Sequence, residues 1–218
     1  MKERLLCLII GYGCGLLQTG YLLGELRGID IRKHGSGNAG TTNMLRTLGP
    51  LWGLLTLLGD FLKCFVAVLI VTRLFGESHA QLLPVLKMYA GLGVTLGHDY
   101  PFYMKWKGGK GVAVAGALAI AFDPLLALPV FGVFLLLFFT THYVSLGSLA
   151  AFATFTLLAL IAGLRGNFDL TGPQFAELMA LVLLMTGLAY WKHRANIRRL
   201  LSGTERRTYI HGQGHEHS

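Results

Sequence analysis

The segment GSGNAGTTNMLRTLG, residues 35–49, combines glycines, short polar side chains and one arginine. Four glycines in fifteen residues allow backbone amides to converge around an anion. If residues 41–48 are helical, Thr42, Asn43 and Arg46 share one face, and Arg46 presents a planar fork suited to phosphate. An ordinary polar loop with a capped helix rarely needs both the glycines and the arginine. We therefore interpret the segment as a phosphate-binding loop.

A second segment, WKGGKGVAVAG at residues 106–116, opens a short apolar run. It is not a Walker A loop, because glycine follows the second lysine where serine or threonine is required. Its glycines expose the backbone, Lys107 and Lys110 bring positive charge, and the following helix N-terminus points free amides at the same place. Two lysines that snorkel to a membrane interface would explain the charges but not the paired glycines. The segment predicts a second phosphate-binding site.

A third segment, WKHRANIRRLLSGTE at residues 191–205, is strongly basic. We interpret its arginines mainly as anchors to lipid headgroups. His193 and Asn196 are three residues apart and share one helical face. Anchoring requires neither an imidazole nor an amide, so these two residues are candidates for the site, although a structural role stays open.

Other polar residues have two readings each. Asp60 and Lys63 lie three residues apart within an apolar run, where ionisable groups are functional candidates, but a mutually neutralising structural pair is favoured. His98 follows an apolar run beside the KGGKG loop and either binds substrate or caps a helix. Ser145 lies on the same side of the membrane and would complete a polar pocket.

The elements that position these residues must lie in a membrane. Hydrophobic residues make up 53% of the chain and charged residues 14%, against about 25% in a typical soluble domain. Such a chain cannot cover a water-facing globule, and a helical bundle in water would need a partner to mask its surface. The net charge of +8 is assigned to anionic lipid and an anionic substrate rather than to nucleic acid. The three cysteines show no metal-ligand spacing.

The sequence predicts an all-α integral membrane protein with seven transmembrane helices in a single domain, residues 1–218, with a polar tail expected to be disordered from about residue 208. The first apolar stretch is too long for a signal peptide and is expected to stay as a helix. The fourth has only twelve residues, about 18 Å of helix, against about 30 Å of hydrocarbon. The seven stretches are Leu5–Gly24, Leu51–Ile70, Gln81–Gly97, Gly111–Phe122, Pro124–Thr140, Val144–Leu164 and Gln174–Trp191.

The distribution of basic residues predicts the orientation. The loops 25–49 and 98–110, with residues 192–207, hold thirteen of the nineteen lysines and arginines, whereas the alternate loops hold only Arg165. The positive-inside rule then places these segments and the C-terminus in the cytoplasm and the N-terminus outside. All three motifs fall on the cytoplasmic side.

Taken together, GSGNAGTTNMLR, GHDYPFYMKWKGGKGVA and HRANIRRLLSGTE resemble the three cytoplasmic motifs of the PlsY family of acyl-phosphate:glycerol-3-phosphate acyltransferases. Order, spacing and the seven-span frame are similar over nearly the whole chain. The resemblance implies transfer of a fatty acyl group from acyl phosphate to the 1-hydroxyl of glycerol 3-phosphate. The products would be lysophosphatidic acid and phosphate, in the first step of phospholipid biosynthesis at the bacterial inner membrane.

The resemblance and the local chemistry together give the predicted site. Small departures from the family pattern, at Ala39, Thr41 and His142, change none of the assigned roles. No metal, no cofactor and no nucleic acid are expected, and the partners are the two substrates and membrane lipids. The predicted catalytic residues are Ser36, Arg46, Lys110, His193 and Asn196, and the predicted substrate-binding residues are Gly37, Asn38, Gly40, Thr42, Asn43, His98, Lys107, Gly108, Gly109 and Ser145.

Arg46, Lys110 and Ser36 are assigned to the glycerol-phosphate end, with His193 and Asn196 orienting it. The KGGKG amides and Lys107 would hold the acyl phosphate, whose tail runs between helices. An acyl phosphate has a good leaving group, so no covalent acyl-enzyme is required. The chief alternative is a transporter for a phosphorylated small molecule, which would need a pathway open to both faces. A lipid-binding scaffold would not explain two glycine loops, and a CDP-alcohol phosphotransferase would need a cluster of aspartates.

Overall fold

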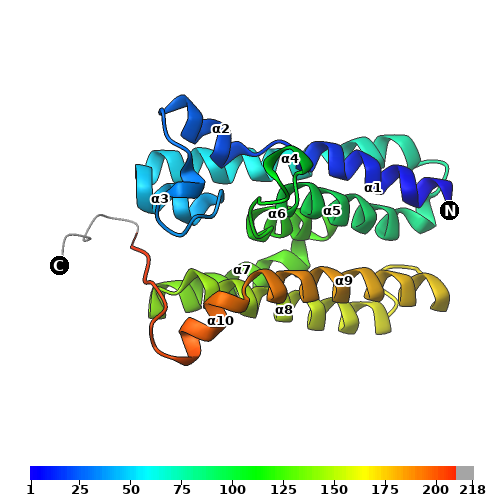
Figure 1. Ribbon diagram of the computed structural model, residues 1–218. Helices are drawn as coiled ribbons and strands as arrows, with labels where there is room; N and C mark the ends of the chain where they lie inside the picture. The colour runs from blue at the N-terminus through cyan, green and yellow to red at the C-terminus, as the bar shows by residue number, and fades with distance from the viewer. Residues whose placement is uncertain (210–218) are drawn as a thin grey trace.

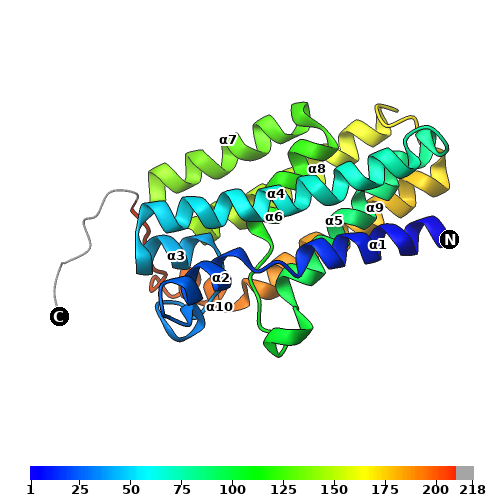
Figure 2. The same cartoon turned by 90° about the horizontal axis from the view of Figure 1, so that it is seen from above.

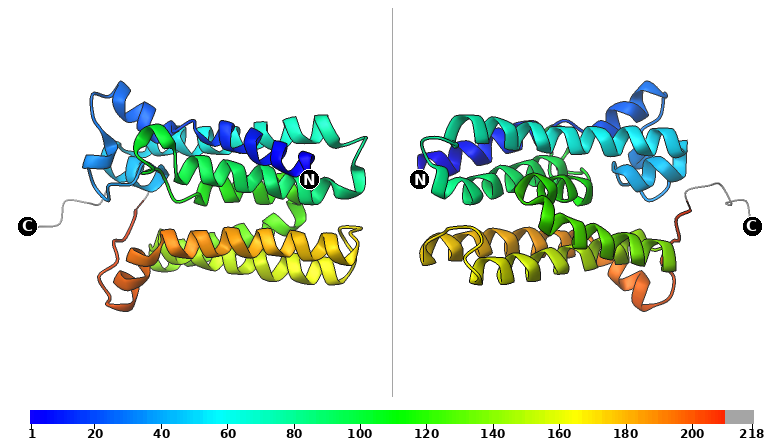
Figure 3. Two further views of the ribbon diagram at one scale, coloured as in Figure 1. Left: turned by 45° about the vertical axis from the view of Figure 1, so that its right-hand side comes forward. Right: turned by 180° about the vertical axis from the view of Figure 1, so that it is seen from behind.

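The computed structural model describes residues 1–209, and all regular elements in this range are helices. Figures 1 and 3 show two layers of helices that share one long axis, with α1–α6 in one layer and α7–α10 in the other. The longer helices are α1 (Lys2–Gly15), α4 (Pro50–Phe75), α5 (Leu83–Asp99), α7 (Pro124–Thr141), α8 (Val144–Leu164) and α9 (Gly172–Lys192). The shorter ones are α2 (Thr19–Leu26), α3 (Thr41–Leu48), α6 (Val112–Phe122) and α10 (Arg194–Leu201).

The chain passes between the layers after α6, and α5 packs against α9 while α6 packs against α4 and α7. At the N-terminal end the layers are joined by Arg4 of α1, whose guanidinium donates to Glu177 of α9 at 2.7 Å. Figures 1 and 2 place α2, α3 and α10 together at the opposite end, where the described chain also finishes. The short helices α2, α3 and α10 are therefore gathered at one end of a long apolar body.

Five segments are long and apolar enough to cross a bilayer: Lys2–Leu26, Pro50–Phe75, Pro124–Thr141, Val144–Leu164 and Gly172–Lys192. The protein is thus a multi-pass membrane protein. The two other predicted spans are shorter: α5 has 17 residues and α6 has 11, about 17 Å of helix. Helix α5 is buried along most of its length and needs no lipid-facing surface, which allows it to carry polar residues. The count of seven crossings and their orientation stay predictions.

The first apolar stretch is long and apolar enough to span the membrane, as predicted, but it is not one continuous helix. The helix stops at Gly15 and restarts at Thr19. The side-chain amide of Gln18, buried at the break, donates to the carbonyls of Gly15, Gly97 and His98 at 3.1–3.2 Å. Backbone groups freed in an apolar medium need such partners, and a hydropathy pattern does not reveal where they are supplied.

The pairing of Asp60 with Lys63 on α4 is confirmed. Their charged atoms lie 2.8 Å apart and both side chains are buried. The ammonium also donates to the carbonyl of Leu17 at 2.8 Å, and the carboxylate accepts from Thr19 at 3.3 Å. The pair therefore stabilises the break between α1 and α2. A third contact of Lys63, 2.8 Å from Nδ1 of His98, links the break to α5.

Helices α1 and α5 pack closely enough to require glycine. A Cβ added at Gly11 would lie 2.1 Å from the carbonyl oxygen of Ala90, and one at Gly93 would lie 2.3 Å from that of Leu8. Both distances are far below van der Waals contact with rigid backbone. Glycine thus allows the backbones of α1 and α5 to meet directly, as is common between membrane helices.

Gly11→Ala is expected to destabilise the protein by about 1–3 kcal/mol, because the added methyl group forces α1 away from α5. Gly13→Ala on the same helix is the matched control, since nothing lies within 4 Å of its added Cβ. Thermal unfolding in detergent measures the difference. Equal melting temperatures for the two variants would contradict the close approach of α1 and α5.

Candidate active site

A polar cavity of about 550 Å³ lies at the end of the body that carries the short helices. Its walls come from the loop before α3, the N-terminus of α6, the start of α8, the α9–α10 junction and the segment after α10. Segments from all three sequence motifs therefore meet around one space. Twelve predicted site residues line it: Ser36, Gly37, Asn38, Gly40, Thr42, Asn43, Arg46, His98, Lys110, Ser145, His193 and Asn196.

Three predicted residues lie outside these walls. Lys107 is exposed, and the amides of Gly108 and Gly109 donate to the carbonyls of Asp99 and His98 at 3.2 and 3.0 Å. A Cβ at either glycine would lie 2.0 Å from an atom of His98. The glycine pair thus packs the loop onto the end of α5, and these amides do not point free into the cavity. Their role in substrate binding stays a prediction.

The loop before α3 is held by Asn43, whose side chain is 2% exposed. Its oxygen accepts from the amide of Ser36 at 2.8 Å, and its nitrogen donates to the carbonyls of Ile31 and His34 at 3.1 and 3.0 Å. Gly35 has a φ of 58°, in the region that favours glycine, and a Cβ there would meet Asn43. Asn43 therefore fixes the loop that presents Ser36. The helix expected over residues 41–48 is present as α3, and it carries Asn43.

Arg46, on α3, reaches across the cavity to the segment after α10. Its guanidinium donates to the carbonyl of Arg206 at 3.0 Å and to the hydroxyl of Thr208. Burial lowers the pKa of Arg46 from its ordinary value, although an arginine stays charged at any working pH. The guanidinium of Arg46 is thus held at the cavity by neutral oxygens. The oxygen of an anionic ligand can replace them as the hydrogen-bond acceptor.

The opposite wall is the N-terminus of α6. Gly111 has a φ of 70° and turns the KGGKG loop into the helix. Gly111, Val112 and Ala113 all line the cavity, and the first amides of a helix have no partner within the helix. Lys110 precedes this turn and faces the same space. An anion in the cavity would meet both a helix N-terminus and an ammonium.

A continuous chain of hydrogen bonds links Lys110 to the C-terminal segment. Lys110 donates to the side-chain oxygen of Asn196, and the Asn196 amide nitrogen donates to Glu205 at 2.6 Å. Glu205 also accepts from Ser145 at 2.8 Å and from Arg199 at 2.7 Å. The carboxylate fixes the orientation of the Asn196 amide, since its nitrogen must point to Glu205 and its oxygen to Lys110.

Burial and neighbouring charges shift the titration of this chain. Burial lowers the pKa of Lys110 to about 8, against a smaller opposing effect of Glu205. For Glu205 burial raises the pKa, but the hydrogen bonds from Asn196, Ser145 and Arg199 outweigh it and the net pKa is lowered. At neutral pH the cavity therefore contains a charged but partly desolvated lysine beside an ionised glutamate.

His193 lies at the junction of α9 and α10 and is 3% exposed. Its Nδ1 is 2.7 Å from the carbonyl oxygen of Ala189, which can only accept, so Nδ1 carries the hydrogen. Burial, with the charge of Lys110, lowers the pKa of His193 to about 4. The imidazole is neutral at pH 7, and its Nε2 is left as a hydrogen-bond acceptor.

Sequence reasoning missed Glu205, Arg199 and Thr208, which all line the cavity. Glu205 carried a usable signal, because it is the single acidic residue of the basic segment 191–207. The tail was expected to begin at about residue 208, yet Thr208 is buried and its amide donates to the carbonyl of His142 at 2.9 Å. The tail from about residue 208 stays a prediction, because its remainder, 210–218, lies outside the described residues.

The fold and the cavity define a multi-pass helical membrane protein with a cationic cavity suited to an organic phosphate. Within residues 1–209 no group of three or more metal-ligating side chains gathers. The family model described as glycerol-3-phosphate acyltransferase matches residues 5–203. The chain belongs to this family, the PlsY family, and is an acyltransferase.

Relatives and solved structures agree with the family assignment. The glycerol-3-phosphate acyltransferases of Geobacter sulfurreducens and Aquifex aeolicus are 39% and 37% identical, and the alignments cover 95% and 94% of this chain and 98% and 99% of those proteins. A crystal structure of PlsY, an integral membrane glycerol 3-phosphate acyltransferase in its glycerol 3-phosphate form, is similar with a TM-score of 0.81 at 35% identity. That similarity covers 94% of this chain and 96% of the other.

Glu205→Gln is expected to lower kcat/KM for glycerol 3-phosphate about tenfold or more. The substitution keeps the shape of the side chain but removes the charge to which Asn196, Ser145 and Arg199 donate, and charge-assisted hydrogen bonds are about twice as strong as neutral ones. Glu25→Gln, at an exposed position, is the control. Steady-state kinetics of both variants, with thermal unfolding alongside, measures the effect, and equal kcat/KM values would contradict it.

The pKa of Lys110 predicts a pH dependence. Because burial lowers this pKa to about 8, kcat/KM for glycerol 3-phosphate should fall as the pH rises above about 8, where the free enzyme loses the ammonium charge. The phosphate monoester stays dianionic across this range. Lys110→Arg keeps its charge and should show a lower kcat/KM without the alkaline fall. If kcat/KM of Lys110→Arg fell at high pH with the same midpoint as the wild type, the titration would belong to another group.

Proposed function

We propose that this acyltransferase takes its acyl group from an acyl phosphate and transfers it to the 1-hydroxyl of glycerol 3-phosphate, giving lysophosphatidic acid and inorganic phosphate. The observation that carries the proposal is one polar cavity with two anion-binding walls. Arg46 and the Ser36 loop form one wall, and Lys110 with the N-terminus of α6 forms the other. Two walls suit two substrates that both carry a phosphate.

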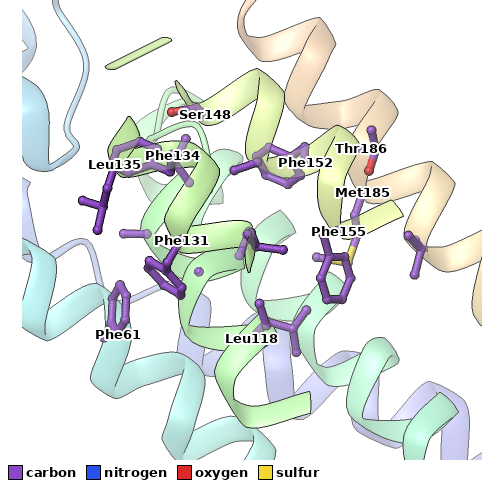
Figure 4. A pocket seen from close by; sticks show the side chains of 18 of the residues that line it. Phe61, Leu118, Phe131, Phe134, Leu135, Ser148, Phe152, Phe155, Met185 and Thr186 are labelled. Carbon is purple, nitrogen blue, oxygen red and sulfur yellow. The ribbon is translucent and has the colours of Figure 1, made fainter. Parts of the chain in front are cut away.

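An apolar cavity of about 260 Å³ adjoins the polar one and supports a donor with a fatty chain. Figure 4 shows it lined by aromatic and aliphatic side chains, among them Phe131, Phe134 and Phe152. Leu57, Val112, Ala113, Phe134 and Ser148 line both cavities, so the two lie directly beside each other. A molecule with a phosphate head and an acyl tail fits this arrangement. A related structure is described as the lysphosphatidic acid form of PlsY, at 35% identity and a TM-score of 0.79.

In the proposed reaction the glycerol hydroxyl oxygen attacks the carbonyl carbon of the acyl phosphate. The bond between that carbon and the bridging phosphate oxygen breaks, and the phosphate leaves with the electron pair. The amides of Val112 and Ala113 and the ammonium of Lys110 stabilise the negative charge that develops. Arg46 and the Ser36 loop hold the glycerol phosphate, which places the hydroxyl against the carbonyl.

His193 orients the hydroxyl in this scheme through its Nε2 acceptor. An imidazole whose pKa is lowered to about 4 is a weak base. A phosphate group titrates with a pKa of about 6 and is the stronger base of the two. The hydroxyl proton therefore passes to the departing phosphate. This assignment predicts that His193→Gln, which keeps a hydrogen-bond acceptor, retains more kcat than His193→Ala, and equal losses in the two would contradict it.

The proposed topology has seven spans, with the N-terminus outside and the cavity on the cytoplasmic side of the bacterial inner membrane. The gathering of basic residues at the cavity end supports it through the positive-inside rule. A cysteine placed at the exposed position of Arg198 should react with an impermeant maleimide in inverted vesicles and not in intact cells. Labelling in intact cells above the wild-type background would contradict this orientation and place the cavity end outside.

The proposed reaction is tested with purified protein in a lipid medium, palmitoyl phosphate and labelled glycerol 3-phosphate. Phosphate and lysophosphatidic acid should appear in equal amounts, and acyl-CoA offered as a parallel donor should give none. Arg46→Ala should reduce kcat/KM for glycerol 3-phosphate about a hundredfold, because a desolvated phosphate loses its bidentate partner. Turnover with acyl-CoA alone would overturn the donor assignment, and unchanged activity of Arg46→Ala would overturn the site.

A further inference from the structure

The apolar cavity extends from the polar one in a single direction. On α8 its lining runs from Ser148, which it shares with the polar cavity, through Phe152 to Phe155. Phe155 lies seven residues after Ser148, which corresponds to about 10 Å along the helix. The linings on α6 and α9 also move away from the polar cavity, to Ala119 and Val182. The cavity therefore extends from the side that it shares with the polar cavity to the level of Phe155, and we call it the channel, with that far side as its inner end.

Aromatic packing fixes the side chain at the inner end. The ring of Phe155 meets the ring of Phe122 edge to face, with centroids 6.1 Å apart. Phe122 in turn meets Phe168 with centroids 5.2 Å apart. Phe122 is the last residue of α6, Phe155 lies in the middle of α8 and Phe168 lies in the loop between α8 and α9, so the three rings join α8 to the end of α6 and to that loop. Edge-to-face pairs of this kind hold their rings in place.

The wall formed by α6 is made of small residues. Ala115, Gly116 and Ala119 line the channel opposite the phenyl groups of α7 and α8. A Cβ at Gly116 would lie 3.2 Å from the ring of Phe131 and 3.5 Å from that of Phe61. Any larger side chain at Gly116 would therefore occupy the channel about midway between the polar cavity and Phe155.

We propose that Phe155 sets the longest acyl chain that the enzyme accepts, by closing the inner end of the channel that holds the donor's tail. The proposal rests on the proposed function, since it takes the fatty chain of the acyl donor as the occupant. The lining that the channel shares with the polar cavity selects this occupant, because the head group and the tail of one molecule must be held side by side. Gly116 has the complementary role of keeping the channel open.

The test measures kcat/KM for a series of saturated acyl phosphates of six to twenty carbons. In the wild type, kcat/KM should rise about fourfold for each methylene that is buried and stop rising at the length that reaches Phe155. Phe155→Ala should move that limit to a chain about two to four carbons longer, and Gly116→Leu should move it to a shorter one. The control is Phe175→Ala, which removes a phenyl group packed against Gly163, outside the channel lining.

Ratios of kcat/KM between donors within one variant do not depend on the fraction of folded enzyme, so partial misfolding cannot imitate the shift. Opposite shifts in Phe155→Ala and Gly116→Leu, with an unmoved profile in Phe175→Ala, are expected. An unmoved profile in both channel variants, in an enzyme that uses acyl phosphates, would overturn the role of Phe155. Failure of the wild type to use any acyl phosphate would instead overturn the proposed function itself.

Discussion

The contact between Lys110 and Asn196 joins parts of the chain that are otherwise far apart. Lys110 ends the KGGKG loop before α6, and Asn196 lies on α10, in the other layer of the molecule. Glu205 completes the link by accepting from Asn196 and Ser145. Three segments that the sequence separates by tens of residues are thereby held around one cavity. The carboxylate of Glu205 also offsets the mutual repulsion of the cationic groups that line the cavity, and its charge raises the pKa of Lys110 against the effect of burial.

Polar groups buried inside the membrane body also support the site. At the break between α1 and α2, Gln18 and Lys63 donate hydrogen bonds to backbone carbonyls, because the surrounding hydrocarbon offers no hydrogen-bond donors. Lys63 also contacts His98, whose carbonyl receives the amide of Gly109. The buried charges of α4 thus support the loop that carries Lys110. A polar network of this kind is stable only when nearly all its members are satisfied, which ties the fold of the apolar body to the geometry of the site.

Local sequence patterns predicted the features of the protein that depend on residues close together in the chain. Composition and hydropathy indicated a helical membrane protein, and the glycines, Arg46 and Lys110 indicated phosphate binding, because these properties follow from residue type and short spacing. They did not predict the break at Gln18, whose partners Gly97 and His98 are about eighty residues away. Glu205 was missed although it is the single acidic residue of segment 191–207, and the paired glycines were assigned to the ligand although they pack on His98. These features depend on tertiary contacts between helices, which a single sequence does not display.

The most direct test of the central link is a double-mutant cycle between Lys110 and Asn196, read out by the affinity for glycerol 3-phosphate in titration calorimetry. The single variants Lys110→Met and Asn196→Ala and their combination give the coupling energy. If the two residues act as one unit, the double variant should bind little worse than the weaker single variant, with a coupling of about 0.5–3 kcal/mol. Additive losses, with a coupling near zero, would contradict the claim that this contact assembles the phosphate site.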